Sequence, residues 1–94
     1  MATTKMTEQE FMDAAANGDA DAVTTGLEQG LKPDITDRYG NTALMMACAR
    51  AQAEVCRILL EAGASPEHKN RFGLGPRNWA SWAENDARIR ALLG

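Results

Sequence analysis

The sequence contains few large hydrophobic residues. Leucine, isoleucine, valine and phenylalanine together account for 15 of its 94 residues, whereas alanine alone contributes 17. A low share of large apolar residues indicates disorder when the net charge is also high, but here the net charge is −3. We therefore expect one folded domain over residues 1–94, with a core of small side chains and little area to spare for a deep cavity.

Long hydrophobic runs and an export signal are also absent. The longest uncharged apolar run, residues 43–49, is far shorter than the roughly 20 residues that span a bilayer. The first ten residues include no apolar stretch of the kind that a secretory signal requires. We therefore expect a cytoplasmic protein without a membrane partner. In that reducing environment the two cysteines, Cys48 and Cys56, are expected to be buried free thiols rather than a disulfide.

The sequence also lacks the common catalytic and metal-binding motifs. It has no phosphate-binding G-x-x-x-x-G-K-[ST] segment, and the glycines of residues 73–75 lack the third glycine of a dinucleotide site. His68 is the sole histidine, and one imidazole makes neither a zinc site nor a catalytic triad, so we interpret it as a solvated loop residue. Asp19 and Asp21 are expected to be caps or solvated side chains. We therefore expect no enzyme activity, no cofactor and no metal.

Charge of the two signs is unevenly distributed along the chain. Residues 1–37 carry eight acidic and two basic residues, a net charge of −6, whereas residues 38–94 carry five acidic and eight basic residues, a net charge of +3. A charge of +3 over 57 residues is weak support for nucleic-acid binding, which we do not expect. The opposite charges leave open a weak self-association of an otherwise monomeric protein.

A repeat of 33 residues runs through the sequence. When the chain is displaced by this distance, Leu27 falls on Leu60 and Leu60 on Leu93, while Gly30 falls on Gly63. A fixed period of this length is typical of a solenoid, in which each unit contacts only its neighbours. We expect the three leucines to lie in similar surroundings along one hydrophobic spine. The units are expected at about residues 4–36, 37–69 and 70–94.

Each unit is predicted to contain two antiparallel helices and a loop. In the central unit, Val55, Ile58, Leu59 and Ala62 recur at the spacing of one helical stripe, and the glycine that follows is suited to end the helix in a left-handed conformation. Thr42 is a good N-cap for a shorter helix before it. The segments between units have turn composition and no helical pattern.

Capping signals place the helices of the first and last units. Thr7 begins a capping box, and Asp19 can cap a second helix that is the weakest prediction because it contains Gly26. Pro76 is suited to the first position of a helix, and Asn85 to the cap of a last helix over residues 87–93. The predicted fold class is therefore all-α.

The central unit resembles the ankyrin repeat. The family pattern is D-x-x-G-x-T-P-L-H-x-A, followed by a helix that ends L-L-x-x-G-A. The resemblance implies an all-α helix-turn-helix solenoid with hairpin-like loops, covering roughly residues 7–94. The residues that match are Gly40, Thr42, Leu44, Ala47, Leu59, Leu60, Gly63 and Ala64.

The sequence departs from this family pattern at several turn positions. Ala43 and Met45 stand where the family has proline and histidine, so the usual polar network between units is missing. In the next unit Asn70 replaces the aspartate and Gly75 the threonine. We therefore expect fewer turn hydrogen bonds and a stability near the low end of the range of about 5–15 kcal/mol for domains.

The resemblance implies a non-catalytic protein–protein interaction module that binds a partner through its concave loop and short-helix surface. Arginine and aromatic side chains are enriched at interface hot spots, and they recur along this surface. An alternative is a small dedicated inhibitor or neutraliser of a specific enzyme or toxin. The expected partner-binding residues are Arg38, Tyr39, Asn41, Arg50, Arg71, Phe72, Leu74 and Trp82.

Structural roles remain open for the aromatic members of this set. Tyr39 and Phe72 lie one period apart, so their rings could pack on each other. Trp82 occupies a position that the family usually leaves polar, but it could instead cover the end of a small core.

Overall fold

The computed structural model describes residues 5–82 and 87–93, with the side chains of residues 80–82 excepted. Within this part of the chain the structure contains six helices and no extended strand. The helices are α1 (Glu8–Asn17), α2 (Ala20–Glu28), α3 (Ala43–Ala49), α4 (Ala53–Glu61), α5 (Pro76–Trp82) and α6 (Ala87–Leu93).

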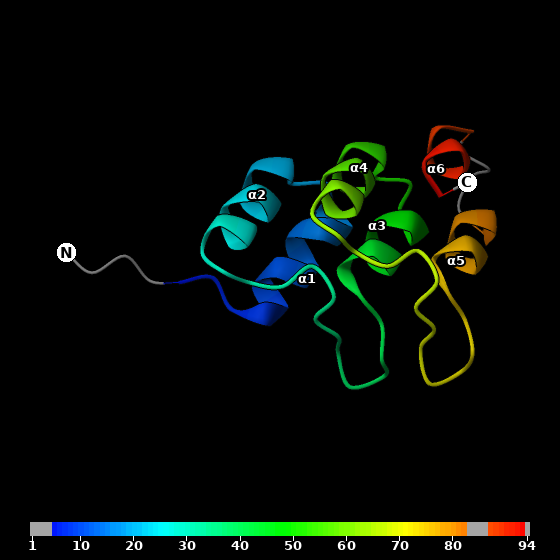
Figure 1. The fold of residues 1–94 in the computed structure, drawn as a ribbon, viewed down its shortest axis with the longest axis horizontal. Helices are drawn as coiled ribbons and strands as arrows, with labels where there is room; N and C mark the ends of the chain where they lie inside the picture. The colour runs from blue at the N-terminus through cyan, green and yellow to red at the C-terminus, as the bar shows by residue number, and fades with distance from the viewer. Residues whose placement is uncertain (1–4, 83–86, 94) are drawn as a thin grey trace.

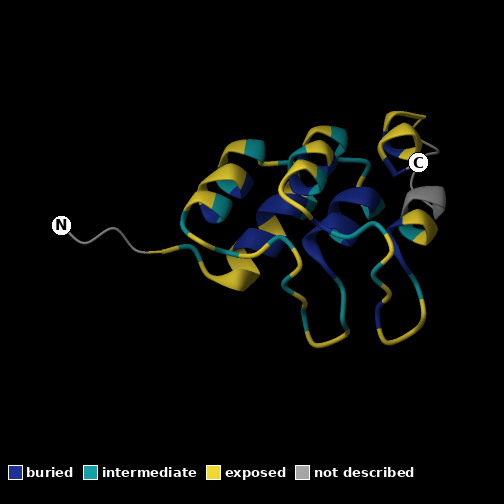
Figure 2. Cartoon of the chain, in the orientation of Figure 1, coloured by how far each residue is buried: buried dark blue, intermediate teal, exposed yellow. Residues whose placement is uncertain are grey.

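The six helices form two layers. Figure 1 shows α1, α3 and α5 side by side in one layer and α2, α4 and α6 in a second layer beside it. Two long loops project from the first layer, one before α3 and one before α5, and Figure 2 shows that their tips are exposed. The middle helix α3 contacts both α1 and α5, and α4 contacts both α2 and α6. The expected all-α helix-turn-helix solenoid is therefore confirmed.

The predicted helix starts are confirmed wherever the structure describes them. The side-chain oxygens of Thr7, Asp19 and Thr42 each accept the backbone N–H of the third residue after them, at 3.1, 3.1 and 3.3 Å. At Thr7 the glutamate three residues on returns the bond, which completes the capping box. Pro76 is the first residue of α5, as expected. The predicted cap Asn85 lies outside the described residues.

The 33-residue spacing produces a continuous hydrophobic core. Leu93 is buried in this core, and Leu27 and Leu60 pack against it while partly exposed, so the three leucines belong to one continuous cluster. A second set with the same spacing is buried more completely, and a search for identical residues could not find it because its members differ. These residues are Val23, Cys56 and Ile89, with 0%, 0% and 1% exposure.

A close contact between α1 and α2 explains the helix with the weakest prediction. Phe11 is fully buried, and a Cβ atom placed on Gly26 would lie 2.6 Å from Cδ1 of its ring. Glycine is therefore required here to let the two helices approach, although it is a poor helix former. One period later the equivalent positions hold Leu44 and Leu59, both fully buried, so the central unit divides its apolar volume between both helices.

The two cysteines are buried free thiols, as predicted. Their Sγ atoms lie 3.6 Å apart between α3 and α4, well beyond the ~2.05 Å of a disulfide bond. The hydrogen bond with the Cys56 thiol, together with burial, raises the pKa of the Cys48 thiol above its usual range. Cys48 therefore stays protonated at neutral pH, and the pair behaves as two small apolar residues.

Ala51, in the link between α3 and α4, has a left-handed backbone with φ of +57°, where the equivalent residue one period earlier is Gly18 with φ of +76°. We expect Ala51→Gly to raise the free energy of unfolding by about 0.5–1 kcal/mol. The left-handed conformation costs alanine about 1–2 kcal/mol, which exceeds the ~0.5–1 kcal/mol of added unfolded-state entropy of glycine. Urea unfolding followed by far-UV circular dichroism measures the difference.

The control for this substitution is Ala16→Gly within α1. The chemical change is the same, but this backbone is helical, so the free energy of unfolding should fall by about 0.5–1 kcal/mol. A fall of similar size for Ala51→Gly would show that the link does not adopt the left-handed conformation in solution.

Candidate functional site

The two projecting loops are hairpins of the same construction. Asp37 Oδ1 accepts the backbone N–H groups of the second and fourth residues after it, both at 2.9 Å, and an isolated bridge between Thr36 and Thr42 closes this first hairpin. In the second hairpin, Asn70 Oδ1 accepts the two equivalent N–H groups at 2.8 and 3.0 Å. One side-chain oxygen thus shapes each hairpin, and a carboxylate or an amide serves equally well.

The expectation that Asn70 weakens the second hairpin is therefore wrong. The amide keeps both turn hydrogen bonds of an aspartate, and its Nδ2 also donates to Asn41 Oδ1 at 2.8 Å, a bond that an ionised aspartate cannot form. Gly75 has no side chain to cap α5, but its backbone N–H donates to Asn78 Oδ1 at 2.8 Å. These bonds compensate for the departures from the family pattern that the sequence showed in this hairpin.

Polar contacts join the second hairpin to the first. The Arg71 N–H donates to the Tyr39 carbonyl oxygen at 2.9 Å, and His68 Nε2 lies 3.2 Å from the carbonyl oxygen of Gly40. His68 is half-buried, so its interpretation as a solvated loop residue is corrected. Together with the Asn70 amide, these contacts hold the two hairpins in one row.

Two aromatic rings and two arginines share the exposed end of this row. The Tyr39 and Phe72 ring centroids lie 6.4 Å apart at an angle of 31°, and the Arg38 Cζ lies 5.1 Å from the Tyr39 centroid. The two rings therefore contact each other, but Phe72 remains 70% and Tyr39 44% exposed. We call Arg38, Tyr39, Arg71 and Phe72 the tip surface.

Three of the other predicted partner-binding residues, Asn41, Leu74 and Arg50, are not part of the tip surface. Asn41 and Leu74 are half-buried within the hairpins, where they take part in the turn hydrogen bonds. Arg50 is exposed at the C-terminal end of α3, whereas the first hairpin enters this helix at its N-terminal end. The side chain of Trp82 lies outside those that the structure describes.

An open groove of about 500 Å³ adjoins the tip surface, between the start of α1 and the first hairpin. Its walls are Glu8, Gln9 and Met12 on one side and residues 36–39 on the other. Sequence reasoning missed this groove because it assigned the acidic residues of the first unit to a solvated face.

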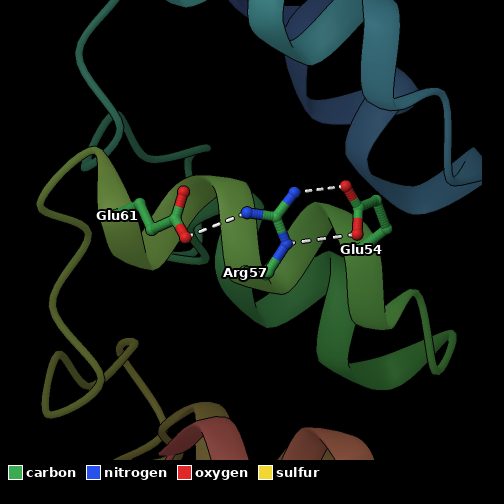
Figure 3. A network of polar contacts seen from close by, with 3 residues as sticks. All are labelled: Glu54, Arg57 and Glu61. Atoms are coloured by element: carbon green, nitrogen blue, oxygen red, sulfur yellow. Dashed lines mark hydrogen bonds and ion pairs between the residues drawn. The ribbon is translucent and has the colours of Figure 1, made fainter.

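A second polar cluster lies on α4, in the other helix layer. Arg57 forms ion pairs with Glu54 and with Glu61, and the Glu61 pair is 2.9 Å long (Figure 3). Hydrogen bonds from Arg57 lower the pKa of the Glu54 carboxyl, and both glutamates raise the pKa of Arg57. Because all three side chains are exposed to solvent, these pairs contribute little to stability.

Neither a metal site nor a membrane span is found in the described residues. No group of three or more histidine, cysteine, aspartate or glutamate side chains within residues 5–82 and 87–93 is arranged to hold a metal ion. None of the helices described above has the length and apolar character needed to cross a bilayer.

Stacked helix pairs joined by projecting hairpins define a class of repeat solenoid. The family model for ankyrin repeats, in three copies, matches residues 11–94. The chain therefore belongs to the ankyrin repeat family, and the resemblance noted in the sequence is confirmed.

Known relatives and a solved structure agree with this assignment. The chain is 30% identical over 84 residues to an ankyrin repeat-containing protein of Treponema pallidum (strain Nichols), covering 89% of this chain and 28% of that protein. It is 31% identical over 67 residues to human ankyrin repeat domain-containing protein 63, covering 71% of this chain and 18% of that protein. The crystal structure of the human ASB11 ankyrin repeat domain superposes with a TM-score of 0.82 at 26% identity, covering 88% of this chain and 38% of that chain. The chain thus spans less than a third of the length of these two relatives.

Proposed function

We propose that this chain is a non-catalytic module that binds a partner protein through the tip surface. Ankyrin repeats are generally protein–protein interaction modules and typically lack catalytic activity. The observation that carries the proposal is the exposure of Phe72, at 70%, on a hairpin whose backbone is held by its own hydrogen bonds. A large aromatic side chain on a preformed support buries much area at a low entropic cost on binding.

The arginines of the tip surface support the same function. Arg38 stacks over Tyr39, so its guanidinium presents a cation and a flat apolar face together. Arg71 is exposed beside Phe72 in the second hairpin. Arginine and aromatic residues dominate the binding energy of many interfaces, so these side chains are the proposed hot spot.

A photo-crosslinker at the tip surface tests this proposal. The full chain carrying p-benzoylphenylalanine at position 72 is expected to crosslink to a specific partner protein, whereas the same group at Ala62, an exposed residue after α4, is not. With the purified partner, Phe72→Ala should weaken binding tenfold or more, because truncated hot-spot residues cost above ~1–2 kcal/mol. Leu92→Ala, a partly exposed leucine on α6, should leave affinity unchanged.

Equal crosslinking from both positions, or an unchanged affinity of Phe72→Ala, would exclude the tip surface as the binding site. Comparable urea midpoints for the variants would show that the loss of affinity does not come from unfolding. If the captured partner is an enzyme or toxin, its activity in the presence of the chain decides whether the module acts as an inhibitor.

A further inference from the structure

Among the residues that the structure describes, no backbone hydrogen bond reaches one edge of the first hairpin, at Arg38. On its other edge, the second hairpin docks by donating the Arg71 N–H to Tyr39 O at 2.9 Å. The residue one period before Arg71 is Arg38, which lines the groove and whose backbone N–H has no hydrogen-bond partner among the described residues. By its place in the repeat, the Arg38 N–H is the counterpart of the donor that joins the hairpins elsewhere, and a carbonyl oxygen of an occupant can accept it.

The side chains at this edge differ from their counterparts between the hairpins. Between the two hairpins, Asn70 Nδ2 donates to Asn41 Oδ1. The residue one period before Asn70 is Asp37, and the residue one period before Asn41 is Glu8; both line the groove. Because an ionised carboxylate has no donor, these two cannot bond each other as the amides do. The occupant must therefore supply the donor.

Both carboxylates can still accept hydrogen bonds. Asp37 accepts two backbone N–H groups on Oδ1 and the Asn41 amide on Oδ2 at 3.3 Å, which leaves part of its capacity of about four acceptor sites unused. Glu8 is exposed and forms no hydrogen bond or ion pair through its side chain within the described residues.

The charge and shape of the groove select the kind of donor. The groove is lined by two carboxylates, those of Glu8 and Asp37, and by one cation, the Arg38 guanidinium, which is already placed over the Tyr39 ring. A lining with this excess of negative charge attracts a cation. Met12, largely buried in the groove wall, offers an apolar contact for the aliphatic stem of a long basic side chain.

We propose that the groove binds an extended segment of the partner protein that places a lysine or arginine side chain between Glu8 and Asp37. A carbonyl of the same segment accepts the Arg38 N–H. This inference rests on the proposed function and specifies the chemistry of the partner. A second copy of this chain fits less well. If its second hairpin docked beside the first hairpin of this chain, Leu74 of that copy, the counterpart of Asn41, would face Asp37. Leucine has no side-chain donor for this carboxylate.

Binding of a short basic peptide to the full chain tests this inference. We expect the capped peptide Ac-Ala-Val-Lys-Val-Ala-NH2, titrated into the ¹⁵N-labelled chain, to shift the amide signals of Arg38, Gln9 and Met12 saturably in the millimolar range. The peptides with norleucine or glutamate in place of lysine should bind at least tenfold more weakly. Binding of the lysine peptide should also weaken with added salt.

Matched variants locate the binding energy. Asp37→Asn is expected to retain the fold, because Asn70 shapes the second hairpin with the same side chain. The double variant Asp37→Asn with Glu8→Gln should weaken lysine-peptide binding at least tenfold. The control Glu28→Gln, which changes an exposed glutamate on α2, should leave that binding unchanged. No saturable shift, or equal binding of the norleucine peptide, overturns the inference. If the partner captured through position 72 binds the double variant with unchanged affinity, the groove proposal is wrong and the tip surface stands.

Discussion

Replacing Phe11 with alanine should lower the free energy of unfolding by about 3–5 kcal/mol, the usual cost of a buried phenylalanine. The ring is fully buried between α1 and α2, and Gly26 beside it has no side chain that could fill the cavity. Because leucine, isoleucine, valine and phenylalanine together number only 15 in the chain, the loss of one buried phenylalanine removes a large part of the core. The measurement is urea unfolding followed by far-UV circular dichroism.

Phe72→Ala is the matched control, because it makes the same chemical change at a ring that is 70% exposed. Its free energy of unfolding should stay within about 0.5 kcal/mol of the parent chain. Equal losses for the two substitutions would contradict the different burial of the two rings.

Gly26→Ala should destabilise the protein by about 1–3 kcal/mol, the usual cost of overpacking a core. Helix propensity alone predicts the opposite sign, with a gain of up to about 1 kcal/mol for alanine. The steric effect dominates because the new Cβ would lie 2.6 Å from the Phe11 ring and 3.1 Å from Met6 Sδ. Phe11 has no exposed surface toward which it could move. The change in the free energy of unfolding therefore decides between propensity and packing.

A double-mutant cycle identifies the ring as the cause. Phe11→Leu with Gly26→Ala should cost less than the sum of the two single changes, because the smaller leucine leaves room for the new methyl group. Thr24→Ala, at an exposed position of the same helix, should raise stability slightly through propensity. A stabilising effect of Gly26→Ala would show that α1 and α2 do not approach as closely as described.

The features of the fold that depend on local chemistry were predictable from the sequence. Thr7, Asp19 and Thr42 cap helices through hydrogen bonds that span three residues, and Gly63 has the expected left-handed backbone with φ of +101°. The role of Gly26 was not predictable, since it depends on a ring 15 residues earlier in a different helix. Helix α2 was predicted weakly because Gly26 was judged only by its low helix propensity and not by its contact with Phe11.

The candidate site was predicted in part, for the same physical reason. Tyr39 and Phe72 come together because the 33-residue period places equivalent hairpin tips side by side. The second role of Asn70 needs the neighbouring hairpin as acceptor, so the replacement of aspartate was misjudged as a loss. Arg50 belongs to the same unit as Tyr39, but it lies at the C-terminal end of α3, whereas the hairpin that carries Tyr39 enters the helix at its N-terminal end. Membership of the same repeat did not reveal this separation.

The buried thiol pair gives the protein a built-in reporter. Both sulfurs lie in the central unit, and neither cysteine has exposed surface. A thiol-alkylating reagent therefore reaches them only when α3 and α4 separate, so the labelling rate in native buffer measures the opening equilibrium of the middle repeat. Compared with the global unfolding equilibrium, that rate distinguishes a solenoid that opens one unit at a time from one that unfolds as a whole.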